Sequence, residues 1–251
     1  MKKKFSVILV AILLLTTTLA LAACGIGQSE WDEGIEAYKT ADVITLKIHD
    51  RYVELNFDEP RVVTDLEISF DANKGIVYIH EESTSSHVVD IDPSKRKYEW
   101  YYVLDGANVN LYKKSLRWYT NDEWHQVQPI TFDTEAEARQ YLRYLYLHPQ
   151  FNDEEEFPSF LEIGYDGRGP LTTGRSKTFK ENLFKNKFTL NFSDDEFEYE
   201  YILKFTNGKP SKFTYKHKLL QFGIAGTRKF SMTIKYSATV NLPDDLPSAS
   251  K

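Results

Sequence analysis

The sequence predicts an α+β fold with one long antiparallel sheet packed on a few helices. Aromatic residues make up 14% of the 251 residues, with 16 Tyr and 16 Phe, and such residues pack well on pleated sheets. Most of the chain alternates apolar and polar residues between turn sequences, which is the pattern of strands joined as hairpins. Two stretches instead have the spacing of an amphipathic helix. This mixture favours α+β.

The N-terminal segment has the organisation of a secretory signal peptide. Positions 2–4 are three lysines, and an uncharged apolar run follows from Phe5 to Ala20, with small residues after it. An uncleaved N-terminal anchor is the alternative, because the apolar segment up to Ala23 is near the shortest that spans a bilayer, ~20 residues.

The end of that segment, Leu21-Ala22-Ala23-Cys24, resembles the lipobox of bacterial lipoproteins in all four positions. The resemblance implies that the thiol of Cys24 receives a diacylglycerol and that cleavage falls just before Cys24. Stable anchoring generally takes two acyl chains, which a diacylglycerol supplies. We therefore predict a signal peptide at 1–23, a lipidation site at Cys24, a tether at 24–30, and a location on the extracytoplasmic face of the cell membrane.

The charge of the mature chain is expected to be acidic. Without the three lysines of the signal, 28 Lys and Arg remain against 37 Asp and Glu, a net charge of −9. With no basic tract in the sequence, this balance argues against nucleic acid as a partner and predicts a domain without a basic patch, so that only the anchor holds it to the membrane. Cys24 is the one cysteine, so stability must come from the core and not from disulfides.

The first half is expected to contain a helix followed by a meander of strands. The helix runs from Ser29 to about Lys39, with acids in its first turn that complement the helix dipole. The strands expected after it are Val43–Leu55, Val62–Phe70, Ile76–His80, Tyr98–Leu104, Asn108–Lys114 and Trp124–Ile130, with a short one at His87–Ile91. Asp71–Gly75 and Asp105–Gly106 are turn sequences that join neighbouring strands as hairpins.

The second half begins after a helix predicted within Thr131–His148, which opens with the capping box Thr134–Glu137. The glycine-rich stretch Gly164–Gly174 is either a boundary between halves or a long loop. After it we expect a helical turn and then four strands, at Phe179–Phe184 and at Lys187–Phe192, Phe197–Phe205, Ser211–Leu219 and Lys229–Leu242. The whole domain is predicted to span 31–247, with a disordered tail at 248–251.

Motifs for catalysis or for metal binding are not found in the sequence. His80 and Glu82 would share one face of a strand, which permits a weak metal site but is more typical of a solvated pair. Asp90–Ser94 starts like a calcium loop but lacks its later glycine and glutamate. The acidic runs Asp153–Glu156 and Asp194–Glu196 read as solvated faces. We therefore predict no catalytic residues, no metal and no cofactor.

Two aromatic hairpin regions carry a family resemblance. Glu99–Gly106 leads through Asn110–Lys114 to Arg117–Tyr119, and Thr206–Phe213 is followed by Ile234–Ser237 and Leu242–Pro243. This order resembles LolA-like and LolB-like extracytoplasmic proteins over about Val43 to Leu246. The resemblance implies a strongly curved, incomplete antiparallel barrel whose concave face is plugged by helices and binds acyl chains or lipoprotein lipid. It carries no residue-specific ligand motif, so the ligand-binding residues stay unknown.

Three functions follow as hypotheses. The first is a membrane-anchored lipoprotein that is not an enzyme and binds a lipid or other apolar ligand in the half-barrel cavity. The second is an envelope interaction protein that docks on another protein through edge strands or exposed aromatics such as Trp118 and Tyr119. The third is a hydrolase, which would need converging carboxylates or histidines.

Overall fold

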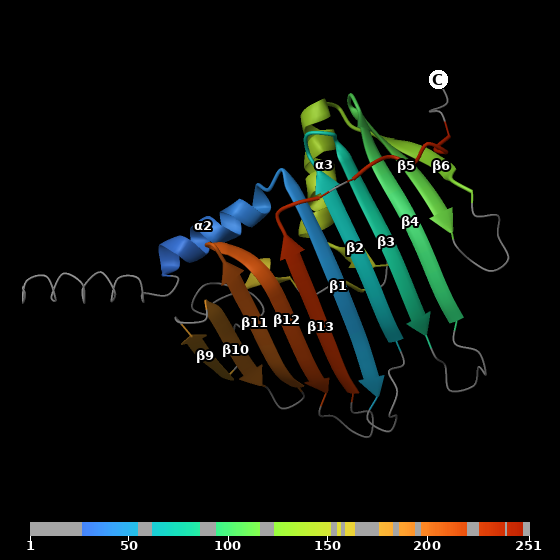
Figure 1. Ribbon diagram of the computed structural model, residues 1–251. Coiled ribbons are helices and arrows are strands. Elements are labelled where there is room, and N and C mark those ends of the chain that lie inside the picture. Colours follow the sequence, from blue (N-terminus) through green and yellow to red (C-terminus); the bar gives the residue numbers. More distant parts are fainter. Residues whose placement is uncertain are drawn as a thin grey trace, which may run out of the picture.

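The computed structural model of the protein describes residues 27–54, 62–85, 94–115, 123–151, 155–156, 159–163, 176–182, 186–193, 197–219, 226–238 and 240–247. One sheet of eleven strands dominates this part of the chain (Figure 1). Its strands are β1 Val43–Glu54, β2 Val62–Asp71, β3 Ile76–Ser85, β4 Ser94–Asp105, β5 Asn108–Ser115, β6 His125–Thr131, β9 Ser176–Asn182, β10 Lys187–Ser193, β11 Phe197–Thr206, β12 Lys209–Leu219 and β13 Gly226–Lys235. Two short strands, β7 Gln150–Phe151 and β8 Glu155–Glu156, pair separately.

The sheet consists of two meanders that meet in its middle. The strand order is β6-β5-β4-β3-β2-β1-β13-β12-β11-β10-β9, and each of these neighbouring pairs is antiparallel. The central pair joins β1 to β13, with Ile48 opposite Met232. Because β6 and β9 stand at opposite ends of this order, the sheet is open. The predicted fold class, α+β with an incomplete antiparallel barrel, is confirmed.

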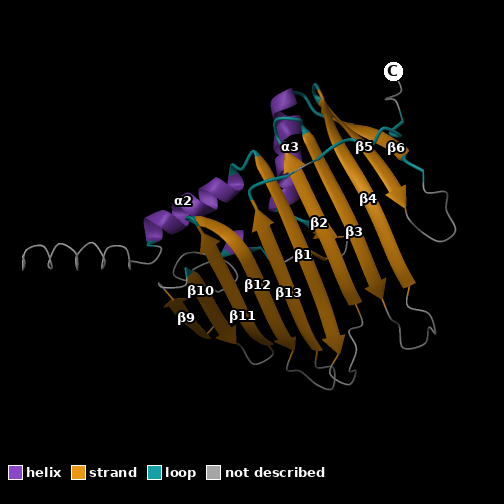
Figure 2. Cartoon of the chain, in the orientation of Figure 1, coloured by secondary structure: helices purple, strands orange, loops and turns teal. Residues whose placement is uncertain are grey.

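In the described ranges, three helices accompany the sheet: α2 Gln28–Lys39, α3 Glu135–Leu147 and the 3-10 helix η1 Phe160–Glu162 (Figure 2). The two α-helices agree with the sequence prediction. Because α2 begins at Gln28, its first three residues lie within the range 24–30 that is predicted as a tether. The Thr134 hydroxyl caps α3 by accepting from the backbone N–H of Glu137 at 3.2 Å. The carboxylate of Glu137 accepts from the backbone of Asp133, one residue before the position that a capping box uses.

Alternation along the strands gives the sheet two different faces. On β1, Ile44, Leu46 and Ile48 are buried in one cluster with the residues of both α-helices, and we call this side the helix-covered face. The intervening Lys47 points to the other side, the outer face, where it is exposed. A period of two therefore separates the core from the surface, as the sequence predicts.

Three hairpin turns of the described chain have a glycine with positive φ, two of them at the predicted turn sequences Asp71–Gly75 and Asp105–Gly106. Gly75, Gly106 and Gly208 have φ of 65°, 59° and 72°, the left-handed region that glycine adopts without steric cost. Asn207 precedes Gly208 with φ of 52°, so both central residues of this hairpin have positive φ, as a type I′ turn requires.

The predicted strands Ile76–His80 and Tyr98–Leu104 are too short, since β3 ends at Ser85 and β4 begins at Ser94. Two predictions for the second half of the chain are also wrong. The helical turn predicted at Phe179–Phe184 is strand β9 up to Asn182, paired with β10. Its apolar spacing is too short to distinguish a turn of helix from a strand, and pairing with a neighbour decides the outcome. The last strand, predicted at Lys229–Leu242, instead begins at Gly226 and ends at Lys235.

Residues 236–238 and 240–247, called the C-terminal segment below, leave the sheet and cross its outer face. Side chains of the sheet hold their carbonyl groups: Thr45 donates to Ser237 O at 2.8 Å, and Lys74 donates to Val240 O at 2.7 Å. Val240 is 2% exposed and packs on β3, β4 and β5. The segment therefore covers the outer face of the N-terminal meander, as Figure 1 shows.

Candidate ligand-binding face

Side chains of the helices fill the helix-covered face where α2 and α3 meet it. The rings of Tyr38 and Tyr146 pack edge to face, 5.7 Å apart, and Phe70 of β2 lies 5.0 Å from Tyr146. The Tyr38 hydroxyl donates to Tyr146 O at 3.3 Å, and the Tyr146 hydroxyl donates to Tyr38 O at 3.0 Å. Burial raises the pKa of Tyr146 to about 12. Both phenols stay neutral hydrogen-bond donors, and this region is packed core.

Farther along β11 and β12 from α2, the same face carries stacked rings, which we call the aromatic ladder. It consists of Tyr201 opposite Tyr215 and Tyr199 opposite His217. The first pair has ring centroids 4.8 Å apart, and the second has nearly parallel rings at 4.6 Å. Tyr201 and Tyr215 are buried, whereas Tyr199 and His217 are half-buried. The ladder therefore runs from the packed core to a flat aromatic surface that solvent reaches.

An ion pair lies next to the half-buried end of the ladder. Arg228 of β13 stands opposite His217 on one side and Tyr52 on the other. Its guanidinium donates to the Asp50 carboxylate from Nε at 2.9 Å and from Nη2 at 2.7 Å. The two side chains are 19% and 14% exposed. Because several hydrogen bonds offset the cost of burying the charges, a polar group is fixed within an apolar face.

Glu81 is a second polar group of this face, on β3 of the other meander. It lies between Leu66 of β2 and Tyr98 of β4 and is 2% exposed. Burial raises its pKa to about 7, although a hydrogen bond from Ser83 and the charges of Lys113 and Arg96 oppose the shift. Its Oε1 atom accepts no hydrogen bond from the described residues. A single carboxyl that titrates near neutral pH binds a proton there but is not an acid–base pair.

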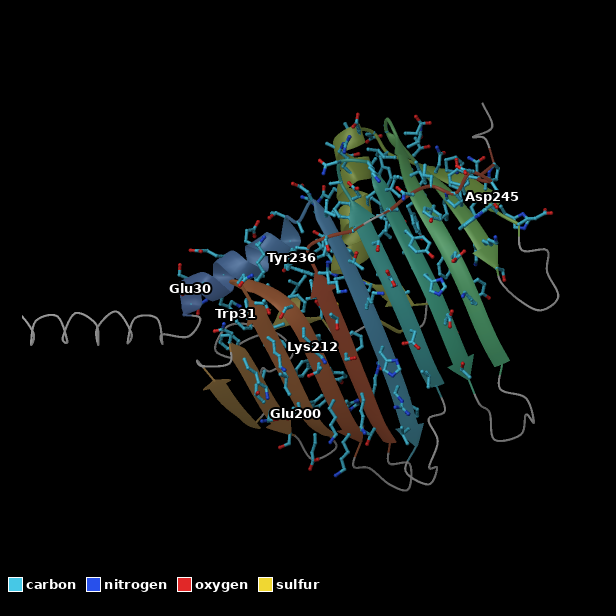
Figure 3. The ribbon with its side chains drawn as sticks, in the orientation of Figure 1. Glu30, Trp31, Glu200, Lys212, Tyr236 and Asp245 are labelled. Carbon is cyan, nitrogen blue, oxygen red and sulfur yellow. The ribbon has the colours of Figure 1, made fainter. Side chains whose placement is uncertain are left out.

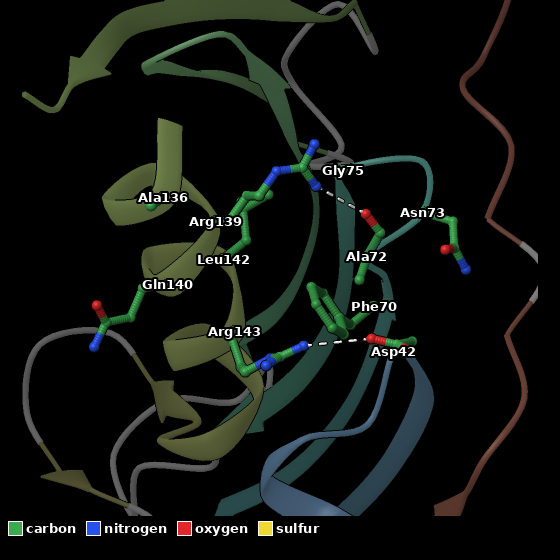
Figure 4. A pocket seen from close by; sticks show the side chains of 10 residues that line it. All are labelled: Asp42, Phe70, Ala72, Asn73, Gly75, Ala136, Arg139, Gln140, Leu142 and Arg143. Carbon is green, nitrogen blue, oxygen red and sulfur yellow. Dashed lines mark hydrogen bonds and ion pairs between the residues drawn. The ribbon is translucent and has the colours of Figure 1, made fainter. Parts of the chain in front are cut away.

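A groove of about 500 Å³ lies elsewhere, between α3 and the turn that joins β2 to β3 (Figure 4). Its two guanidinium groups are already engaged. Arg139 lies 2.7 Å from Glu135 and donates to Ala72 O at 3.2 Å, and Arg143 lies 3.5 Å from Asp42. The contacts with Ala72 and Asp42 join α3 to the residues next to the sheet. Because both guanidinium groups already have partners, the groove offers little free charge to a ligand.

The structure tests only some of the predicted site residues. His80 and Glu82 share a face, as predicted, with 3.2 Å between Nε2 and Oε1. Among the described residues, no cluster of three His, Cys, Asp or Glu side chains could bind a metal. Cys24, Trp118 and Tyr119 lie outside the described residues, as do the side chains of the acidic runs 153–156 and 194–196.

The expectation of a domain without a basic patch is wrong. Strand pairing gathers Lys204, Lys212, Lys216 and Lys229 on the outer face of β11–β13, where all four are exposed. Net charge hides this cluster because it sums over both meanders. The sequence does contain a pattern that predicts this cluster: Lys212 and Lys216 alternate with the apolar residues Phe213 and Tyr215, which places both lysines on one face of the strand.

Comparisons with known proteins give no family for this chain. No protein-family model matches it, and no curated protein sequence does. Among solved structures, it is similar to the S-type phycobiliprotein lyase CPES from Guillardia theta, with 8% identity, a TM-score of 0.28, and coverage of 84% of this chain and 97% of that chain. It is also similar to a LolA superfamily protein, NE2245 from Nitrosomonas europaea, with 9% identity, a TM-score of 0.25, and coverage of 86% and 94%. TM-scores this low do not establish a common fold.

Neither α2 nor α3 has the length and apolar character to cross a bilayer, and the same holds for the rest of the described ranges.

Proposed function

We propose that the chain is a bacterial lipoprotein, anchored through Cys24 on the extracytoplasmic face of the membrane, whose domain is not an enzyme and binds an apolar ligand on the helix-covered face. The observation that supports the binding role is the half-buried end of the aromatic ladder beside the Asp50–Arg228 pair. Stacked rings offer a flat apolar surface, and the ion pair offers a fixed polar group. This combination suits an amphiphile with an acyl chain and a polar end.

Ligand binding can be tested with the full chain purified in detergent. Titration with a fluorescent fatty acid should show saturable binding, and native mass spectrometry should detect bound lipid. Tyr199→Ser removes one ring of the ladder and should weaken binding at least about tenfold, as expected for the loss of one aromatic contact. Tyr144→Ser is the matched control, because Tyr144 of α3 is 43% exposed and lies outside the ladder. Repeated absence of any bound lipid would count strongly against the proposal.

The anchor has a separate test. Intact mass of the chain from a bacterial membrane should show loss of residues 1–23 and addition of a diacylglycerol at Cys24. Cys24→Ala should leave the precursor unprocessed, and an unchanged mass and membrane attachment in this variant would exclude lipidation.

Docking on another envelope protein is the second candidate. Edge strand β6 favours it, because most of its side chains are exposed and Val127 is 40% exposed. The same strand contains Pro129, and its pairing with β5 has an irregular register between Val109 and Leu111. Both features protect edges against added strands, so we rank ligand binding first. In-cell cross-linking from β6 to one dominant envelope protein would reverse this order.

A further inference from the structure

The outer face of the C-terminal meander carries two rows of opposed basic residues. In the first row, Lys187, Lys204 and Lys212 lie directly opposite one another on β10, β11 and β12. In the second row, Lys216, Lys229 and Arg51 do so on β12, β13 and β1. Five of these side chains are exposed and Lys187 is half-buried. We call these six residues the lysine face, and Figure 3 labels Lys212 within it.

Glu198 and Glu200 of β11 lie on the same outer face as these six residues, but neither forms an ion pair with them in the part of the chain that the structure describes. Among the described residues, none of its six side chains forms an ion pair, and the neighbouring Glu198 is engaged by Lys218 at 3.4 Å. Glu200, opposite Lys216, is half-buried. Like charges directly opposite each other destabilise a sheet. Edge protection does not account for them, because β11, β12 and β13 are interior strands.

Hydroxyl groups lie between the two rows. Thr214 is directly opposite Ser231. On β12, Thr214 lies between Lys212 and Lys216 on the same face, and on β13, Ser231 lies two residues from Lys229 on that face. Cations interleaved with hydroxyl donors suit oxygen-rich anions such as phosphate, which accept hydrogen bonds from both. The surface is a sheet face spanning five strands, broad enough for many headgroups at once.

The position of α2 indicates which anionic surface is near. Trp31, in the first turn of α2, packs on Phe188 and Phe205 at 4.8 and 5.4 Å between ring centroids. The residues just before these two phenylalanines are Lys187 and Lys204, which point to the opposite side of the same strands. Cys24 precedes Gln28 by four positions, which reach at most about 14 Å. Gly34 of α2 packs on the β11–β12 turn at Gly208, so α2 lies at the end of the strands that carry Lys204 and Lys212. A membrane that holds the N-terminal segment would meet the lysine face from that end of the sheet.

We propose that the lysine face docks on the anionic phospholipid headgroups of the membrane that holds the N-terminal segment, with the helix-covered face turned away from the bilayer. This inference rests on the anchoring part of the proposed function. A basic surface is one of the features that can add to the membrane attachment of a lipid anchor, and each cation near an anionic leaflet adds attraction that salt screens. A free acidic polymer would satisfy the charges equally, but its binding would not depend on proximity to the anchor.

The test uses the full chain in vesicles and an amine-reactive reagent, with mass spectrometry to measure modification of each lysine. In vesicles with about one third phosphatidylglycerol, Lys204, Lys212, Lys216 and Lys229 should be modified at least about fivefold more slowly than in phosphatidylcholine vesicles. Lys39, exposed at the end of α2, is the control and should not change. The protection should disappear at high salt, since screening removes the attraction.

A charge-reversed variant makes the outcome decisive. Lys204→Glu with Lys212→Glu and Lys216→Glu should lose the protection of Lys229, while Lys39→Glu with Lys97→Glu should keep it. Equal modification in both kinds of vesicle, or protection only by an added soluble polyanion, would overturn the inference. The mass at Cys24 is read from the same samples. An unmodified thiol with retained headgroup dependence would contradict the lipid anchor and leave docking intact.

Discussion

The outer face of the N-terminal meander and that of the C-terminal meander belong to one sheet but differ in how many of their cross-strand charges are matched. In the N-terminal meander, opposite charges face each other across strands: Lys47 lies 2.8 Å from Glu67, and Lys97 lies 2.7 Å from Glu82. The bond from Lys97 is the main reason why the pKa of Glu82 is lowered. In the C-terminal meander, Lys218 also lies 3.4 Å from Glu198, but lysine faces lysine at Lys204 and Lys212.

This difference separates stability from function. Cross-strand pairs of opposite charge add up to about 1 kcal/mol each, and like pairs cost a similar amount. The N-terminal meander therefore uses its surface charges to hold strands together, and the C-terminal segment covers part of that face. The C-terminal meander accepts repulsion on a face that stays exposed. Because the like charges of the lysine face lower stability, we expect this face to bind an external partner.

The largest effect should come from charging the covered face. Val240→Asp places a carboxylate in the buried contact with β3, β4 and β5 and should lower the free energy of unfolding by about 3 kcal/mol. Thr214→Asp adds the same charge to the lysine face and should be neutral or slightly stabilising. Urea unfolding of both variants measures the difference. Equal destabilisation by the two changes would show that the faces do not differ.

Glu81 gives the next effect, through pH. Its folded pKa of about 7 lies above the usual range, so folding favours the protonated form, and this contribution to stability is lost as pH rises from about 5 to 8. The loss should be about 2 kcal/mol, allowing for solvent screening.

The measurement compares the wild type with Glu81→Gln, which keeps the shape but does not titrate. As pH rises from 5 to 8, the wild type should lose stability relative to Glu81→Gln. If the difference is the same at pH 5 and pH 8, the burial of Glu81 does not raise its pKa.

A pair of charge reversals tests the comparison directly. Glu67→Lys puts a second cation opposite Lys47 and should destabilise by about 1 kcal/mol. Lys212→Glu instead places an anion opposite Lys204 and should stabilise by about 0.5 kcal/mol. Opposite signs in thermal unfolding would support the two roles. Destabilisation by Lys212→Glu would mean that the lysine face is not strained by its own charge.

Sequence alone predicts most of the elements but not how they meet. Alternation locates β1, β2 and β11 to within a residue or so, because one strand's period is a local property. The pairing of β1 with β13 joins Asp50 to Arg228, 178 residues apart, and no local pattern contains that distance. Glu81 illustrates the same limit, because His80-Glu81-Glu82 reads as a polar run, while the pleat buries only the middle residue. The residues of the candidate ligand-binding face and of the lysine face are brought together by the register of strand pairing, which the local sequence does not specify.

The smallest effect concerns salt. Moving from about 10 mM to 1 M salt shortens the Debye length from about 30 Å to about 3 Å, so repulsion across the lysine face should weaken and the cross-strand pairs of the N-terminal meander should weaken too. Amide hydrogen exchange resolves the two halves separately. Protection should rise by a few tenths of a kcal/mol in β11–β13 and fall slightly in β1–β3. A uniform change along the sheet would mean that salt acts on the core and not on the charges, and the contrast between the two meanders would then have no energetic basis.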